Sequence, residues 1–214
     1  MIEIKDLTFS YNKKKKNVFN NLTININNGL SFIIGNNGVG KSTLMKLIMG
    51  ILKPISGQII VDGEDVSKKK LAQIGRTCGY LFQNPDSMLF ANTVWEELTF
   101  TMELQKIDKC IIEERANSAL KTFGLSGREN EFPLNLSLGQ RQRLALATIF
   151  MREPRRYLLD EPTAMLDYSM KEDLYSLIKI LIETGKDVII ATHDYDFVDR
   201  FKGEIINLSG DTND

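Results

Sequence analysis

The sequence predicts an α/β fold with a mostly parallel core sheet, an N-terminal antiparallel β subdomain and an inserted α-helical subdomain. Strand-like segments alternate with helical ones along most of the chain, which is typical of a parallel sheet covered on both faces. Residues 1–34 instead alternate apolar and polar positions in consecutive strands. A block from about residue 92 to 123 has helical spacing and no strand-like segment.

The expected elements follow in order along the chain. Strands are expected at about 2–9, 22–26, 31–34, 58–61, 157–159, 188–191 and 205–208. Helices are expected at about 44–51, 92–123, 138–151 and 169–183. The basic run 13–16 is expected to be a solvated loop, and the tail after Leu208 is expected to fray.

Composition excludes several classes of protein. The 27 basic and 28 acidic residues nearly cancel, so the charge does not favour binding to nucleic acid. The two cysteines, Cys78 and Cys110, suggest no disulfide framework and favour a reducing compartment. No signal peptide is evident, and no apolar run approaches the ~20 residues that span a bilayer. If the protein serves a membrane, it must dock onto another chain.

Residues 35–42 read G-N-N-G-V-G-K-S, the P-loop pattern, between an expected strand and an expected helix. Its glycines allow successive N–H groups to point at phosphate, and the following helix adds its positive dipole end. Lys41 is expected to reach the β- and γ-phosphates of ATP, Ser42 to ligate Mg²⁺ and Thr43 to lie near the α-phosphate. The other expected ATP-binding residues of the loop are Asn36, Asn37, Gly38, Val39 and Gly40.

A P-loop is shared by kinases, GTPases and many ATPases, so later motifs must decide. Residues 135–143 read N-L-S-L-G-Q-R-Q-R, and residues 157–167 read Y-L-L-D-E-P-T-A-M-L-D. In this order they resemble the signature motif, Walker B strand and D-loop of ABC transporter ATPases, and the resemblance runs from residue 2 to about 208. It implies one ABC ATPase domain, 1–214. Residues 1–84 and 154–214 would form a RecA-like core with the β subdomain, and about 85–153 the helical subdomain with the signature.

The two acids after the apolar strand have separate expected roles. Asp160 should emerge at the carboxyl edge of the sheet, where ligands bind in α/β folds, and hold Mg²⁺. Glu161 should act as the general base for the attacking water. Paired acids at a strand end are otherwise typical of a solvated turn, but the preceding apolar run and the following Pro162 argue against that reading.

Three more residues gain roles through the resemblance. His193, in A-T-H-D, is similar to the H-loop residue that contacts the γ-phosphate; a lone histidine is otherwise more often structural. Gln83 is similar to the Q-loop residue that contacts Mg²⁺ or the water and reports the nucleotide state to the membrane partner. Tyr11 is similar to the aromatic residue that stacks on adenine, although by itself it could be a strand core residue.

The resemblance also implies a second ABC ATPase subunit. Ser137, Gly139 and Gln140 would bind the ATP of a facing subunit, so two chains would close two sites, as a homodimer or a heterodimer. Asp167 would contact that partner. The sequence departs from the family at Leu138, where the usual signature has glycine. A working motif is still expected because Leu138 keeps its N–H.

Residues 81–98, L-F-Q-N-P-D-S-M-L-F-A-N-T-V-W-E-E-L, resemble the ATPases of energy-coupling factor importers, which take up cobalt and vitamins. This implies a peripheral subunit at the cytoplasmic face of the membrane, bound to a transmembrane transporter subunit. Met88, Leu89, Phe90 and Trp95 would offer an apolar patch to a partner helix, or would simply pack the helical subdomain. Three alternatives stay open. The chain could be the ABC ATPase of another importer or of an exporter, or a non-transport ABC ATPase acting on nucleic acid or ribosomes. It could also be a regulatory module with little turnover, against which Glu161 argues.

Overall fold

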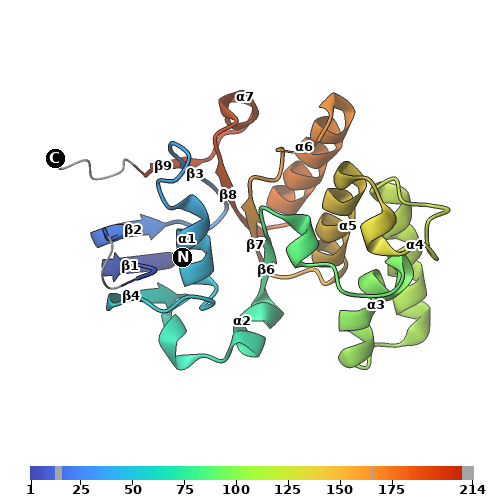
Figure 1. Ribbon diagram of the computed structural model, residues 1–214, viewed down its shortest axis with the longest axis horizontal. Helices are drawn as coiled ribbons and strands as arrows, with labels where there is room; N and C mark the ends of the chain where they lie inside the picture. The colour runs from blue at the N-terminus through green and yellow to red at the C-terminus, as the bar shows by residue number, and fades with distance from the viewer. Residues whose placement is uncertain (13–15, 165, 209–214) are drawn as a thin grey trace.

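The computed structural model describes residues 1–12, 16–164 and 166–208 (Figure 1). Most of the basic run 13–16, expected to be a solvated loop, and the tail after Leu208, expected to fray, lie outside these residues. The described part of the chain contains an antiparallel sheet, a parallel core sheet and a group of helices, and the core sheet lies between the other two (Figure 1). The predicted fold class is confirmed.

The antiparallel sheet has the strand order β2-β1-β4-β5. It consists of β1 (Ile2–Phe9), β2 (Phe19–Ile26), β4 (Ser56–Val61) and the short β5 (Glu64–Asp65). Ile2, Ile4 and Leu7 alternate on β1 with more exposed positions and pack into one apolar cluster with helix α1 (Lys41–Ile48). This packing places the antiparallel sheet against the helix that begins after the P-loop.

The core sheet has the order β6-β7-β8-β3-β9, and its described pairings are parallel. Its strands are β3 (Leu30–Ile34), β6 (Cys78–Leu81), β7 (Arg156–Asp160), β8 (Asp187–Thr192) and β9 (Glu204–Asn207). On β3, Phe32 and Ile34 face one apolar cluster, whereas Ile33 faces the other. Both faces of the sheet are therefore buried, which explains the continuous apolar runs of its strands. The sequence had not predicted β6.

The helical group contains α3 (Val94–Leu104), α4 (Lys109–Thr122) and α5 (Leu138–Met151), which pack on one another. The helix predicted over 92–123 is thus two helices. The break contains Lys106, whose φ is 57°, and Asp108, whose side chain accepts the Cys110 N–H and starts α4. The remaining elements are α2 (Leu71–Thr77), α6 (Tyr168–Glu183), α7 (Tyr195–Val198) and the 3₁₀ turns Val66–Lys68, Pro85–Ser87 and Pro133–Asn135.

Within the described residues, no helix combines the length and the apolar character that a bilayer crossing requires.

Candidate active site

Four strands of the core sheet end at the same edge. Ile34 of β3 pairs with Thr192 of β8, Asp160 of β7 with Ala191 of β8, and Leu81 of β6 with Leu159 of β7. Because the strands are parallel, the segments that follow them meet at this carboxyl edge. The phosphate loop, Gln83, the Asp160–Glu161 pair and His193 are these segments.

The phosphate loop connects β3 to α1, and glycine is required at two of its positions. Gly40 has a φ of 109°, and a Cβ there would lie 2.8 Å from Phe19 Cζ and Val18 Cγ1. A Cβ on Gly35 would lie 2.7 Å from the Leu208 carbonyl oxygen. Among the described residues, no side chain caps the start of α1. Its first N–H groups are therefore available to an anion.

Lys41, the first residue of α1, is folded inward with only 6% of its side chain exposed. Its Nζ donates to the Gly35 carbonyl at 2.8 Å and lies 3.4 Å from Glu161 Oε1. Among the described residues, Lys41 is the only positively charged side chain buried in this site. It bridges the phosphate loop and Glu161, the residue that follows β7. A bound phosphate would compete with Glu161 for this ammonium group.

Glu161 is buried and held by several donors. Oε1 lies 2.9 Å from His193 Nδ1, and Oε2 accepts from Thr192 Oγ1 at 3.2 Å and from the His193 N–H at 3.4 Å. Its backbone has a φ of 49°, a region that costs a non-glycine residue about 1 kcal/mol or more. The Glu161 N–H donates to the Ala191 carbonyl at 2.8 Å, which fixes this turn. The carboxylate is therefore oriented by its surroundings.

Asp160 lies beside Glu161 but in a drier position, 1% exposed. Burial raises the pKa of its carboxyl, although hydrogen bonds from Ser42 and Tyr80 oppose the rise. Tyr80 donates to Oδ2 at 3.3 Å, and Oδ1 has no hydrogen-bond partner within the described part of the chain. A buried, unpaired carboxylate oxygen beside a serine hydroxyl fits a hard cation such as Mg²⁺. The described residues contain no group of three acidic, histidine or cysteine side chains that could hold a metal ion.

Gln83 and Tyr11 lie at the margins of this site. Gln83 is exposed two residues after β6 ends. Tyr11 is 63% exposed, which rules out the alternative that it is a strand core residue. Its hydroxyl lies 3.0 Å from Thr43 Oγ1, and its ring packs edge-on against Phe9. An exposed ring beside the first turn of α1 is accessible to a flat ligand such as a base.

The turn that begins α5 differs from the start of α1 because side chains cap it. The Gln140 N–H donates to Ser137 Oγ at 3.3 Å, and the Ser137 N–H donates to Gln140 Oε1 at 2.9 Å, which is a capping box. Ser137 and Leu138 are exposed, and Gly139 is half-buried. None of the hydrogen bonds or ion pairs between described residues joins this turn to the phosphate loop. The structure thus does not bring these predicted ligands to the loop of their own chain.

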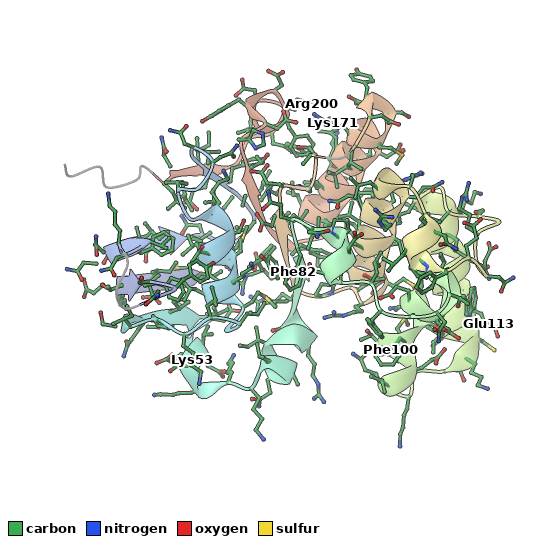
Figure 2. All side chains as sticks on the ribbon, in the orientation of Figure 1. Lys53, Phe82, Phe100, Glu113, Lys171 and Arg200 are labelled. Carbon is green, nitrogen blue, oxygen red and sulfur yellow. The ribbon has the colours of Figure 1, made fainter. Side chains whose placement is uncertain are left out.

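The apolar patch predicted from residues 88–95 is only partly present. Leu89 is buried in the core, and Met88 and Trp95 are half-buried against it. Phe90 is 65% exposed and packs edge-on against Phe100 of α3, with the ring centroids 4.9 Å apart. The exposed aromatic pair is therefore Phe90 and Phe100, the latter labelled in Figure 2.

Sequence reasoning missed two residues that contact the acids. Tyr80 holds Asp160, but it lies on β6, which had no recognisable pattern. Thr192 holds Glu161, and its place in A-T-H-D directly before His193 was a signal that could have indicated it.

A comparison with protein families finds a match between residues 19–164 and the family described as ABC transporter. The chain is 38% identical to a Pyrococcus furiosus protein, over 98% of this chain and 80% of that one. The name of that relative, ABC transporter ATP-binding protein, is provisional. It is also 36% identical to the energy-coupling factor transporter ATP-binding protein EcfA of Methanothermobacter thermautotrophicus, over 98% of this chain and 68% of that protein.

Two solved structures are similar over nearly the whole chain. CbiO1 from Clostridium perfringens, part of the ABC transporter complex cbiONQ, is 33% identical with a TM-score of 0.77 over 96% of this chain and 83% of that one. The ATP-binding cassette MJ0796, in a dimeric post-hydrolysis state bound to ADP and Pi, is 28% identical with a TM-score of 0.86 over 98% of this chain and 95% of that one.

Proposed function

Because the chain belongs to the ABC transporter family, as an ATP-binding subunit that hydrolyses ATP, we propose that it powers solute uptake of the energy-coupling factor type through a separate transmembrane subunit. The solute would be a metal ion or a vitamin. The observation that carries the hydrolytic part is the buried Glu161 carboxylate, held next to Lys41 at the phosphate loop.

In this proposal, ATP enters with its phosphates on the N–H groups of residues 36–43 and its adenine on Tyr11. Lys41 leaves Glu161 for the β- and γ-phosphates, since a phosphate offers more negative charge than one carboxylate. Glu161 then keeps His193 and Thr192 as neighbours and accepts the proton of the attacking water at a carboxylate oxygen. His193, whose side chain is 55% exposed, reaches toward the γ-phosphate.

Asp160, Ser42 and Gln83 would hold Mg²⁺, supported by the unpaired Asp160 Oδ1 and the adjacent Ser42 hydroxyl. The ion would neutralise charge on the phosphate oxygens during transfer. Tyr80 keeps the Asp160 carboxylate aimed at this position.

Two chains would form the working unit. Ser137 Oγ accepts the Gln140 N–H, so its own proton is available to an ATP held by a facing subunit. Gly139 and Gln140, on the same exposed turn, would add backbone donors at the positive end of the α5 dipole. The dimeric state of the similar MJ0796 structure supports this arrangement.

The membrane partner would dock on the helical subdomain, at the cytoplasmic face. The exposed Phe90–Phe100 pair supports this, together with a cavity of about 610 Å³ nearby on α3 and α4. Its lining combines the apolar Trp95, Ile107 and Ile112 with the charged Glu103, Lys106, Lys109 and Glu113. The relatives named for energy-coupling factor and cbiONQ transporters support the importer branch.

Two measurements test the proposal. Glu161→Gln should lower the turnover number at least ~100-fold, keep ATP affinity and stabilise a dimer in ATP; turnover near the wild-type value would disprove the general-base role. Purification of the chain from membranes should recover integral membrane subunits, and loss of that recovery in a Phe90→Ser/Phe100→Ser variant would locate the docking surface. Recovery of ribosomes or DNA instead would favour a non-transport ABC ATPase.

A further inference from the structure

The hydroxyl group of Thr192 links the catalytic acid to the loop after His193. It donates to Glu161 Oε2 at 3.2 Å and accepts the Asp194 N–H at 3.0 Å. Thr192 is fully buried at the end of β8, so neither hydrogen bond competes with bulk water. Any displacement of the Asp194 backbone is therefore passed to the oxygen that anchors one side of the Glu161 carboxylate.

Several groups fix Asp194 in turn, among them the Thr163 side chain, which hydrogen-bonds its carboxylate. Its Oδ1 accepts the Phe197 N–H at 3.1 Å and caps α7, and its Oδ2 lies 2.6 Å from Lys171 Nζ. The ion pair joins two elements that are otherwise separate in the chain, because Lys171 belongs to α6. Figure 2 labels Lys171 at the end of α6 that lies nearest α7.

Lys171 lies in the first turn of α6, and its N–H donates to the Asp167 carbonyl at 3.0 Å. Asp167 also caps α6 by accepting the Met170 N–H at 2.9 Å. The helix start and Lys171 must consequently move together. Asp167 is the residue that the proposed dimer would place at the partner subunit.

We propose that Lys171, Asp194 and Thr192 form a positioning relay that couples the start of α6 to the orientation of the Glu161 carboxylate. When partner contact holds the start of α6 in place, Lys171 holds Asp194, Asp194 holds Thr192, and the Thr192 hydroxyl fixes the position of Glu161 Oε2. Without the relay, the one hydrogen bond that Oε2 retains from a described residue is that of the His193 N–H at 3.4 Å, and the carboxylate rotates about its last bond. The inference rests on the proposed general-base role of Glu161.

A second connection between the same elements provides a matched control. Arg200 forms a bidentate ion pair with Glu172 and stacks over the Tyr175 ring at 4.1 Å. This connection also joins α6 to the segment after α7, but it has no hydrogen bond to Thr192 or Glu161 among the described residues. A general loosening of α6 would affect both connections, whereas only the Lys171–Asp194 ion pair belongs to the relay.

The experiment measures kcat and ATP affinity on the full chain with its partner subunits. Thr192→Val keeps the side-chain shape and removes the hydroxyl; we expect kcat to fall about tenfold, with the Kd of ATP within about twofold of wild type. Thr192→Ser should recover most of the loss. Lys171→Met should lower kcat about fivefold and Lys171→Arg should retain it, whereas Glu172→Gln should leave kcat unchanged.

Equal effects of Lys171→Met and Glu172→Gln on kcat would overturn the relay, as would a Thr192→Val variant with wild-type kcat. If Thr192→Val does not fold, as judged by its thermal transition, the comparison of Lys171→Met and Lys171→Arg with Glu172→Gln tests the relay by itself. Glu161→Gln separates the two proposals. If it retains turnover, the general-base assignment fails; if it abolishes turnover while the relay variants keep wild-type kcat, only the relay fails.

Discussion

Arg156→Met should strongly destabilise the protein, because Arg156 is the centre of a buried ionic cluster. Its side chain is 3% exposed, and Nη2 lies 2.8 Å from Asp187 Oδ2 and 3.1 Å from Asp62 Oδ1. Asp187 also accepts the Gly29 N–H at 2.9 Å, but its side chain is only 8% exposed. Removing the guanidinium leaves this carboxylate charged and almost dry, which costs about 3–5 kcal/mol of unfolding free energy.

Part of the stabilisation that Arg156 provides depends on pH. Burial is the largest influence on Asp62 and acts to raise its pKa, but Arg156 and the N-terminal amino group outweigh it, and the pKa falls from 3.8 to about 2. Without solvent screening, this pKa shift corresponds to roughly 2.4 kcal/mol of unfolding free energy. Because a third of the Asp62 side chain is exposed, screening by solvent reduces that contribution to about 1 kcal/mol. Because the folded pKa is depressed, this stabilisation is complete above about pH 4 and is lost as the pH falls toward 2.

Urea denaturation followed by circular dichroism at pH 7 and near pH 3 measures both effects. The difference in unfolding free energy between wild type and Arg156→Met should be smaller at the lower pH. The neighbouring Arg155 is a matched control, since it is 61% exposed and 3.7 Å from Asp62, and Arg155→Met should cost under about 1 kcal/mol. Equal losses for the two variants, or a difference that does not change with pH, would refute the reasoning.

Lys41→Ala should weaken ATP binding at least about tenfold in calorimetry, through loss of a charge-assisted contact; unchanged affinity would contradict the proposed contact between Lys41 and the phosphates. Gly40→Ala should destabilise the protein by about 1–3 kcal/mol and impair ATP binding, because φ is 109° and the added Cβ meets Phe19 at 2.8 Å; denaturation and calorimetry report the two effects. Asp160→Asn should weaken Mg²⁺ binding and raise the Mg²⁺ concentration that half-maximal turnover requires, which a magnesium titration measures. Leu138→Gly should change turnover less than about threefold; a sharp rise would identify Leu138 as a brake.

The sequence was sufficient for features that depend on local pattern. Strands β3, β7 and β8 each contain a run of at least three apolar residues, because both faces of the core sheet are covered. Each run is followed at once by polar residues, so the position of the carboxyl edge followed from the order of the chain. The convergence of the phosphate loop, Glu161 and His193 could be anticipated for this reason, while their roles stay predictions.

Other features depend on contacts between distant segments, which no local pattern records. Strand β6 is four residues long, contains Gly79 and was not predicted. A Cβ on Gly79 would lie 2.4 Å from Ile149 Cγ2 of α5, so the close packing of α5 requires glycine at this position. The strand therefore lacks a side chain of the kind that indicates a strand in the sequence. Leu89 was expected either to offer an apolar side chain to a partner helix or to pack the helical subdomain, and it is buried in the core. The sequence pattern of its segment is the same in both cases, so the pattern alone could not decide between them.

In the proposed dimer, the turn at Ser137 is the part of one chain that would complete the candidate site of a second chain. Arg141 of α5 lies 2.6 Å from Asp86, in the turn after Gln83, and donates to the Leu136 carbonyl at 2.8 Å. The start of α5 is therefore tied to the segment between Gln83 and the proposed docking surface. Leu138 is 38% exposed on the same turn, so closure on a facing subunit would bury an apolar side chain where the family has bare backbone. Its burial would favour closure, while its bulk would restrict how closely the backbone approaches phosphate; these opposite effects are why Leu138→Gly is expected to change turnover little.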